Sequence, residues 1–301
     1  MRIGLMSSVD NNGTLQDLVD EAHAAQAAGV STFWTAQTFG LDALTALAVI
    51  GREVPDIELG TAVVPTYPRH PMMLAQQALT VQAATGNRLC LGIGLSHQVV
   101  VEAMWGLSYA RPVRHLREYL SAMMPLLEGQ PVRFKGEEYT VRGTVNVPGA
   151  QRPSVVVAAL GPQMLRVAGA LADGTSTWCV GPHTLAQFTI PALRQAAADA
   201  QRPEPRVVAS LPVCVTDDVG AARARAAEVF AMYNQLPSYR AMMDRENVAG
   251  PGELAIAGTE AEVRDQLAEL ASIGVTDFNA AVFGRRGDER DRTHALLRDL
   301  V

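Results

Sequence analysis

The chain has 301 residues, of which 48% are hydrophobic and 19% charged, a composition typical of a globular protein with ample material for a large core. The formal net charge of −6, with acidic and basic residues mixed along the chain, argues against a nucleic acid as the main partner. The sequence contains no run of about twenty apolar residues, and its first residues turn polar too early for a signal peptide, so we expect a cytoplasmic protein without a membrane span.

Short β-rich segments alternate with helical patterns along the whole chain. Eight such segments occur, at residues 2–8, 32–36, 57–64, 89–95, 154–160, 175–180, 207–215 and 277–283. Several are apolar at consecutive positions, as expected for parallel strands buried on both faces. Eight strands, each followed by a helix, predict a closed (β/α)8 TIM barrel. Because barrels commonly run to about 250 residues as one unit, we expect a single domain over residues 1–301.

Local signals predict where several helices begin and end. Thr14 precedes a stretch with apolar residues on one face, and Gly29 follows it where a left-handed helix end would fit. Gly161-Pro162 places a proline at the first position of a helix directly after the fifth strand. The segment Thr259-Glu260-Ala261-Glu262 has the pattern of a capping box.

Two segments interrupt the alternation and are expected to be insertions. In the first, at about residues 129–149, the pattern PVRFKGEEYTV predicts a β-hairpin with its turn at Lys135-Gly136. The predicted cross-strand neighbours are Val132 and Phe134 on one strand and Tyr139 and Val141 on the other. The second, at about residues 233–257, is irregular, and its glycines and proline at 247–252 predict a loop beside the site.

Function in a barrel of this kind lies at the carboxyl ends of the strands. A zinc site is disfavoured, because the first strand ends in Met6-Ser7-Ser8 and the nearest two histidines, His97 and His115, are 18 positions apart. The acids after the seventh strand, Asp217 and Asp218, are expected to cap a helix rather than to cleave glycosides. The three cysteines lack metal-ligand spacing and are expected to be free, buried thiols: Cys90, Cys179 and Cys214.

The segment LCLGIGLSH, residues 89–97, contains Gly92-Ile93-Gly94, which matches the beginning of a dinucleotide-binding fingerprint. That fingerprint needs a third glycine where His97 stands. It also needs an acidic residue about twenty positions later, where Arg111-Pro112-Val113-Arg114 is found. A Rossmann-type site is therefore disfavoured.

A better signal for anion binding follows the fifth predicted strand. Leu160-Gly161-Pro162-Gln163-Met164 would begin a helix there, so that free N–H groups and the positive end of the helix dipole face the barrel mouth. An ordinary βα turn would use the same residues, and this alternative stays open. Arg285 and Arg286 follow the eighth strand and could bind a phosphate or a carboxylate, or could form a solvated surface pair.

Four segments together resemble the luciferase-like oxidoreductase superfamily, and most closely its branch that uses the deazaflavin F420. The longest is TAVVPTYPRHPMMLAQQALTVQAATGNRLCLGIGLSH, residues 61–97. The others are GVSTFWTAQ (29–37), VVVAALGPQMLRVAGALADGTSTWCVGP (155–182) and GTEAEVRDQLAELASIGVTDF (258–278). The resemblance covers nearly the whole chain and implies a bacterial-luciferase-like barrel that binds F420.

The resemblance also implies which residues surround the cofactor. At Ala62-Val63 relatives carry a non-proline cis peptide, in a bulge that supports the central ring of the cofactor. Gly92 and Gly94 would leave room near that ring. The backbone of residues 160–164 would meet the cofactor phosphate, and Arg285 and Arg286 its polyglutamyl tail. The other residues implied to line the cofactor site are Leu95, Ser96, Ala159 and Trp178.

The chain departs from some relatives at a place that matters for mechanism. An Asp-His pair often follows the second strand in the family, whereas Gln37-Thr38 stands here. Hydride transfer at C5 of F420 requires no protein nucleophile, but reduction of a C=C or C=O bond requires a proton. His97 is the nearest titratable candidate for that role, with Gln37 or Thr38 polarising the acceptor. Alternatively, His97 merely packs or caps its loop.

Three functional hypotheses follow. The preferred one is hydride exchange between F420 and a small organic substrate. The mixed apolar and aromatic character of the loops predicted at the mouth suggests that this substrate is fairly hydrophobic. The rival within the same fold is an FMN-dependent monooxygenase, and the third hypothesis is a barrel that binds a cofactor without turnover. The resemblance further implies a homodimer.

Overall fold

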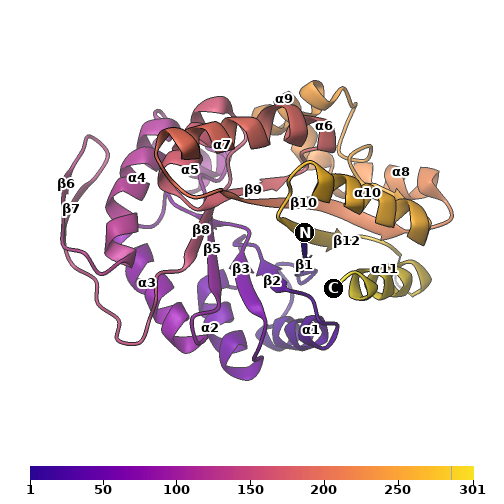
Figure 1. The fold of residues 1–301 in the computed structure, drawn as a ribbon, viewed down its shortest axis with the longest axis horizontal. Coiled ribbons are helices and arrows are strands. Elements are labelled where there is room, and N and C mark those ends of the chain that lie inside the picture. The colour runs from indigo at the N-terminus through magenta and orange to yellow at the C-terminus, as the bar shows by residue number, and fades with distance from the viewer. Residues whose placement is uncertain (286) are drawn as a thin grey trace.

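Eight parallel strands close into a barrel, as the sequence predicts (Figure 1). The computed structural model describes residues 1–285 and 287–301. Each strand pairs with its neighbours around the ring, and β10 pairs with both β9 and β12, which closes it. The barrel strands are β1 (Arg2–Met6), β2 (Thr32–Thr35), β3 (Glu58–Thr61), β5 (Leu89–Gly94), β8 (Ser154–Val157), β9 (Gly174–Trp178), β10 (Arg206–Val215) and β12 (Asp277–Val282).

Helices form the outer layer, and several begin at the predicted caps (Figure 1). The hydroxyl groups of Thr14 and Thr259 accept backbone N–H bonds in the two capping boxes, and Gly29 has φ 77° after the first helix. Within residues 1–285 and 287–301, no helix is long and apolar enough to cross a membrane. The main helices are α1 (Leu15–Ala27), α2 (Ala43–Glu53), α3 (Pro71–Ala84), α4 (Pro112–Leu127), α5 (Pro162–Leu171), α7 (Ile190–Asp199), α8 (Val219–Val229), α10 (Glu260–Ser272) and α11 (Asp288–Asp299).

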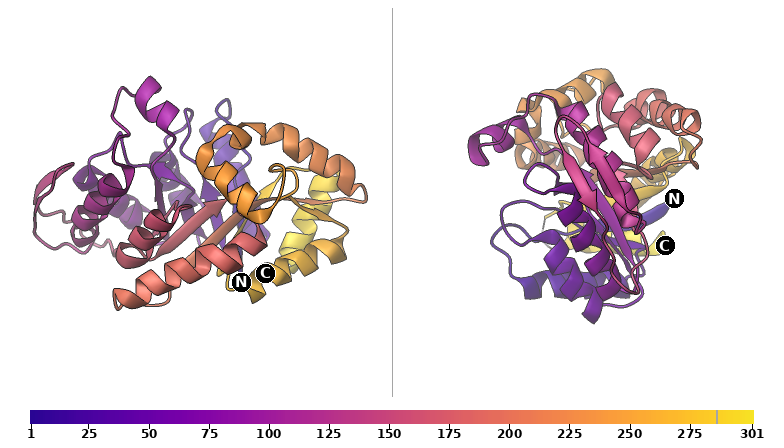
Figure 2. Two further views of the ribbon diagram at one scale, coloured as in Figure 1. Left: turned by 90° about the horizontal axis from the view of Figure 1, so that it is seen from above. Right: turned by 90° about the vertical axis from the view of Figure 1, so that its left-hand side faces the viewer.

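Short elements extend the connections at the carboxyl ends of the strands. They are β4 (Val64–Pro65), η1 (Val100–Met104), α6 (Pro182–Thr184), η2 (Leu185–Thr189), η3 (Ala231–Gln235), α9 (Pro237–Glu246) and β11 (Ile256–Gly258). Figure 2 shows the segments around η1 and α9 on one side of the molecule, and both chain ends beside each other on the opposite side. The carboxyl end of the barrel, called the mouth below, is therefore the end that carries these short elements.

The predicted hairpin forms from β6 (Val132–Lys135) and β7 (Thr140–Gly143), outside the barrel and beside α4 (Figure 1). Phe134 pairs with Val141 and Val132 with Gly143, whereas the predicted hairpin would pair them with Tyr139 and Val141, so the predicted register is wrong. The reason is a longer turn, closed by a hydrogen bond from the Gly136 N–H to the Tyr139 carbonyl. The Glu118 carboxylate holds that turn, because it accepts the N–H groups of Glu137, Glu138 and Tyr139 at 3.0, 2.8 and 3.0 Å.

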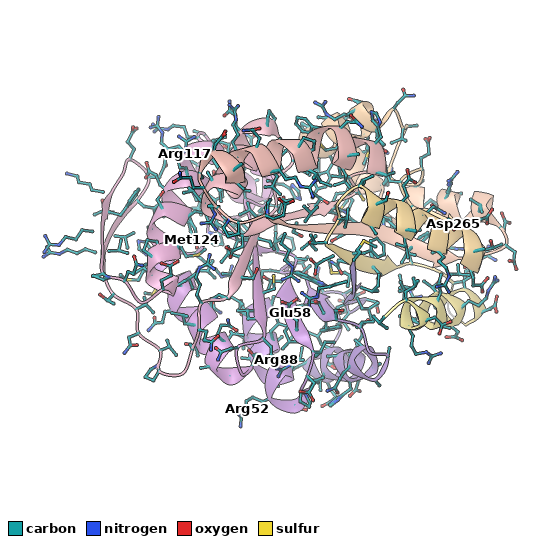
Figure 3. The ribbon with its side chains drawn as sticks, viewed as in Figure 1. Arg52, Glu58, Arg88, Arg117, Met124 and Asp265 are labelled. Atoms are coloured by element: carbon teal, nitrogen blue, oxygen red, sulfur yellow. The ribbon has the colours of Figure 1, made fainter. Side chains whose placement is uncertain are left out.

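An ion cluster closes the amino end of the barrel interior. The Arg206 guanidinium donates to Asp277 at 2.7 and 2.9 Å and to Glu58 at 2.6 and 3.1 Å. Arg2 approaches the same two carboxylates at 3.4 and 3.0 Å. Glu58 lies near the middle of the barrel in Figure 3. Burial acts to raise the pKa of Glu58, but the hydrogen bonds and charge of Arg206 outweigh it and lower that pKa, so the carboxylate stays ionised.

The indole ring of Trp34 fills the next layer of the interior. Trp34 is fully buried and packs against Cys90, Val156 and Val208. The large ring fits because two neighbouring strands have glycine at this level. A Cβ on Gly4 would lie 2.7 Å from the Trp34 Nε1 atom, and a Cβ on Gly60 would overlap the ring.

As predicted, all three cysteines are free and buried. The interior is thus solid, and any site must lie above it, at the mouth.

A buried histidine ties the hairpin to the barrel. His115 on α4 is 5% exposed, and its Nε2 lies 2.9 Å from the Thr66 hydroxyl oxygen while its Nδ1 lies 3.3 Å from the Tyr139 hydroxyl oxygen. Its ring stacks on Tyr67 with 3.8 Å between centroids. Burial lowers the pKa of His115 to about 4, although the charge of Glu118 acts in the opposite direction. His115 is therefore neutral at pH 7.

We expect His115 to make the fold sensitive to mild acid. Between the ordinary pKa of 6.5 and the folded value of about 4, the unfolded chain binds more protons than the folded chain. The free energy of unfolding therefore falls as the pH drops through this window, by about 3 kcal/mol in all. Urea unfolding of the wild type and of His115→Gln at pH 7 and pH 4.5 measures the effect. The wild type should lose more stability than the variant, and equal losses would contradict the assignment.

Candidate active site at the barrel mouth

A bulge between β3 and β4 forms one wall of the mouth. The Ala62-Val63 peptide bond in this bulge is cis, as the resemblance implied. The bulge is fastened to β5, because the Thr61 hydroxyl donates to the Gly92 carbonyl at 2.7 Å and accepts the Gly92 N–H at 2.9 Å. Ala62 also packs against the Trp34 layer of the interior. The bulge therefore rests directly on the packed core.

The two glycines of β5 make room for this bulge. A Cβ on Gly92 would overlap the Thr61 carbonyl oxygen, and a Cβ on Gly94 would lie 2.6 Å from a methyl carbon of Val63. The expectation that both glycines leave space beside a cofactor ring is therefore wrong in its physical reason, since protein atoms take that space. Gly94 still borders the mouth, where its carbonyl accepts the Thr66 N–H at 2.9 Å.

The N-terminus of α5 is a possible anion site. Gly161 is its N-cap residue and Pro162 its first helical residue, as predicted. Within the described residues no side chain caps this helix, and a Cβ on Gly161 would meet no atom within 4 Å. Side chains of His70 and Asp218 cap α3 and α8, whereas α4, α9 and α11 resemble α5 in having no side-chain cap among the described residues. Around this turn Ala159 is buried, while Leu160 and Met164 are partly buried and Gln163 is exposed. The free N–H groups and the helix dipole suit a negatively charged group.

The residues after β2 are held by protein contacts. The Gln37 Oε1 atom accepts the N–H of Ala43 at 2.8 Å, at the start of α2. The Thr38 hydroxyl donates to the Asn11 Oδ1 atom at 2.5 Å. Asn11 lies in a loop expected at the mouth, but the sequence assigned it no role, because its partner Thr38 is 27 positions away. Both candidate side chains thus help to fix loops at the mouth, and the Gln37 amide NH2 group remains the one that can bind a substrate oxygen.

His97 begins the loop that follows β5. Leu95 is buried, and Ser96 takes a left-handed conformation with φ 62°, which turns the chain out of the barrel wall. The His97 carbonyl accepts the N–H groups of Val100 and Val101, both at 2.9 Å, while its ring is partly buried. Burial lowers the pKa of His97 below its usual 6.5. The imidazole is therefore mostly neutral at pH 7 and can accept a proton.

Six aromatic side chains form a continuous wall on the other side of the mouth, called the aromatic arc below. Neighbouring ring centroids along the arc are 6.2, 5.3, 5.7, 4.9 and 6.0 Å apart. In order, its members are Phe283, Phe230, Trp178, Tyr233, Tyr239 and His97. Burial raises the pKa of Tyr233 to about 12 and also raises that of Tyr239, so both phenols stay neutral. The arc offers an uncharged surface with hydroxyl donors.

Helix α9 lies inside the segment that the sequence predicted as an irregular insertion, so that description is wrong for residues 237–246. Pro237 at its first position and the left-handed Asn247 after it are helix signals that could have located it. The carboxylate of Glu246 accepts the N–H groups of His183 and Thr184 at 3.0 and 2.7 Å. Sequence reasoning missed Glu246, because its partners lie more than 60 positions away.

The loop after β12 contains the two arginines proposed for the cofactor tail. Arg285 is exposed, and its backbone N–H donates to the Glu289 carboxylate at 2.7 Å. Arg286 lies outside the described residues.

Asp218 caps α8 through the N–H of Ala221, as predicted. Within residues 1–285 and 287–301, no three His, Cys, Asp or Glu side chains are grouped so that they could hold a metal ion.

The packed barrel, the bulge and the arc at its mouth define a (β/α)8-barrel enzyme. The family model for the luciferase-like monooxygenases matches residues 1–277, so the chain belongs to that family. Over 281 residues the chain is 25% identical to a 5,10-methylenetetrahydromethanopterin reductase of Methanolobus tindarius, covering 92% of this chain and 85% of the relative. It is 32% identical over 198 residues to an F420-dependent glucose-6-phosphate dehydrogenase of Mycobacterium tuberculosis, covering 60% of this chain and 57% of the relative.

Among solved structures, the chain resembles the coenzyme F420 dependent tetrahydromethanopterin reductase from Methanopyrus kandleri. The TM-score is 0.82, with 20% sequence identity, over 99% of this chain and 97% of the other. At this identity the likeness shows a shared fold. It confirms the bacterial-luciferase-like barrel that the sequence predicted.

The contact between β5 and the bulge leads to a test of stability. Gly92→Ala would place a methyl group on the Thr61 carbonyl oxygen, so we expect a loss of about 3 kcal/mol in the free energy of unfolding. Gly161→Ala is the matched control, because no atom lies within 4 Å of its Cβ position and its φ of −84° suits alanine. Urea unfolding of both variants measures the difference. Equal stability of the two variants would contradict the packing described here.

Proposed function

We propose that this protein is an F420-dependent oxidoreductase that moves hydride between the deazaflavin and a small, mainly apolar organic substrate. Named relatives that use F420 support the cofactor. The observation that carries the proposal is the spacing of three features around one mouth. The bulge on β3 and the arc residue Trp178 on β9 are three strands apart, and the open end of α5 follows β8 between them. A flat ring with a phosphate would reach from the bulge to the N-terminus of α5.

The residues present suit F420 at each part of the molecule. The free N–H groups at Gly161, Gln163 and Met164 would hold its phosphate. The bulge at Ala62-Val63 would support one face of the ring, and Leu95 and Ser96 would border it. The remaining residues that we propose to contact the cofactor are Ala159, Leu160, Pro162, Trp178, Gly94, Arg285 and Arg286.

F420, when bound, supplies a ring carbon that takes up or releases hydride. The chain must then hold the substrate carbon about 3 to 3.5 Å from that position and exclude water. The aromatic arc provides a water-poor wall for this purpose. As substrate hydroxyl is oxidised to carbonyl, neutral His97 takes the hydroxyl proton while the hydride leaves with the electron pair of the C–H bond. In the reverse direction protonated His97 returns that proton, and the Gln37 amide orients the oxygen.

FMN is the rival cofactor, because its isoalloxazine ring would occupy the same position in a luciferase-like barrel. With FMN the protein would act as a monooxygenase. A barrel that binds either molecule without turnover is the third candidate. The two experiments below separate these three functions.

Equilibrium titration of the purified protein should show tighter binding of F420 than of FMN. The expected difference is at least tenfold in Kd, and the deazaflavin without its phosphate and tail should bind more weakly than F420, because the N–H groups of α5 then have no anion to bind. Fluorescence of the deazaflavin and of the flavin measures both Kd values. Tighter binding of FMN, or no binding of either molecule, would overturn the proposal.

His97→Gln should lower kcat by about 10²- to 10⁴-fold with any substrate that exchanges hydride with bound F420, because the proton acceptor is removed. The Kd for F420 should change little. His183→Gln is the matched control, since the His183 side chain is exposed and only its backbone N–H is used. Stopped-flow absorbance of bound F420 follows the reaction. An unchanged kcat in His97→Gln would rule out this role, and no turnover of bound F420 with any substrate would favour the non-catalytic barrel.

A further inference from the structure

We propose that Tyr239 is the positioning residue for His97, and that α9 is a lid whose closed state keeps the His97 imidazole away from water. The role of His97 as proton acceptor rests on the proposed function. The contact between the two rings does not, and it can be tested separately.

Tyr239 is wedged between the aromatic arc and His97. Its ring centroid lies 4.9 Å from that of Tyr233, at an interplanar angle of 63°, and 6.0 Å from that of His97, at 58°. Tyr233 packs in turn on Trp178, which belongs to the barrel wall at the end of β9. Because Tyr239 is supported from behind, its ring gives His97 a fixed surface to lie against.

Helix α9 is attached in its middle, where Met242 and Met243 are buried in the main core, and at its far end. Glu246, the last helical residue, is bound to the N–H groups of His183 and Thr184, and the Arg245 guanidinium lies 3.9 Å from the centroid of the Phe188 ring. Arg240 braces the following turn through the carbonyls of Val248 and Ala249, each at 2.7 Å. Tyr239 lies in the first turn of the helix, so a displacement of α9 as a whole, after these attachments are loosened, would separate the two rings.

Burial, and not a neighbouring charge, lowers the pKa of His97, and the charged groups of its loop and of α9 have partners of their own. On its own loop, Glu102 accepts from the Gln98 amide at 2.9 Å and from the Tyr109 N–H at 3.3 Å. On α9, Arg240 donates to Asp244 at 2.8 Å as well as to the two carbonyls. The phenols of Tyr233 and Tyr239 are neutral, as described above. The Tyr239 ring, 6.0 Å from that of His97, is one of the groups that cover the imidazole.

A lid of this kind links substrate access to proton transfer. With α9 closed, the imidazole is neutral and ready to take a proton from the substrate hydroxyl. With α9 open, water reaches the ring, and the proton gained in the reaction can pass to solvent. Opening the lid to release product therefore also resets the proton acceptor.

The test is an NMR titration of the His97 ring in the full-length protein, with the resonance assigned from His97→Gln. In Tyr239→Ala the pKa of His97 should rise toward its usual 6.5, because water replaces the phenol ring. In Tyr239→Phe the pKa should stay at the wild-type value, since the ring is kept. Glu246→Gln, which weakens the attachment of α9 without touching either ring, should shift the pKa in the same direction by a smaller amount.

An unchanged His97 pKa in both Tyr239→Ala and Glu246→Gln would overturn the proposal, and Glu246→Gln decides alone if Tyr239→Ala does not fold. The activity of His97→Gln tests the proposed function separately. A shifted pKa combined with full activity of His97→Gln would leave the positioning contact in place and remove the catalytic role of His97. Loss of activity in His97→Gln, combined with an unshifted His97 pKa in the other variants, would keep the catalytic role of His97 and remove the positioning role of Tyr239.

Discussion

The contact between Thr61 and Gly92 determines the form of the barrel mouth. Two hydrogen bonds join this hydroxyl to one residue of the next strand, and the missing side chain lets the Thr61 carbonyl approach the β5 backbone. The bulge can then rest on the Trp34 layer, and β4 can return to pair with β5. This close approach of two strands positions the wall that the proposed cofactor would lie against. It also positions the start of the loop that carries His97.

The residues that stabilise the barrel lie at its amino end and in its middle, whereas the candidate site lies at its carboxyl end. The amino end is filled by Arg206 and the carboxylates of Glu58 and Asp277, which are paired so completely that losing one partner would leave a buried charge at a cost of about 3 to 5 kcal/mol. The Trp34 ring fills the middle of the barrel interior. The mouth, by contrast, keeps N–H groups at α5 without a side-chain cap among the described residues, and it keeps a neutral imidazole. The amino end thus holds paired charges, while the mouth holds polar groups that a ligand could bind.

The sequence was sufficient to predict those features that depend on neighbouring residues. Strand periodicity located all eight strands, and short motifs located the caps at Thr14, Thr259 and the Gly161-Pro162 helix start. Features that depend on distant residues were missed or misread. Glu246 meets its partners only after the fold is complete, and the reason for glycine at position 92 appears only when Thr61 is placed beside it. The hairpin register depended on Glu118, which lies on a different element.

The Arg206 cluster has a consequence for synthesis of the chain on the ribosome. Its carboxylates come from residues 148 and 71 positions away, and the first strand pairs with the last. An emerging N-terminal half can form helices and neighbouring strand pairs, but Glu58 can pair there with Arg2 alone until Arg206 appears. The barrel can close only after β12 has left the exit tunnel. Until then the growing polypeptide exposes the apolar edges of its strands, and chaperones can bind these edges during most of translation.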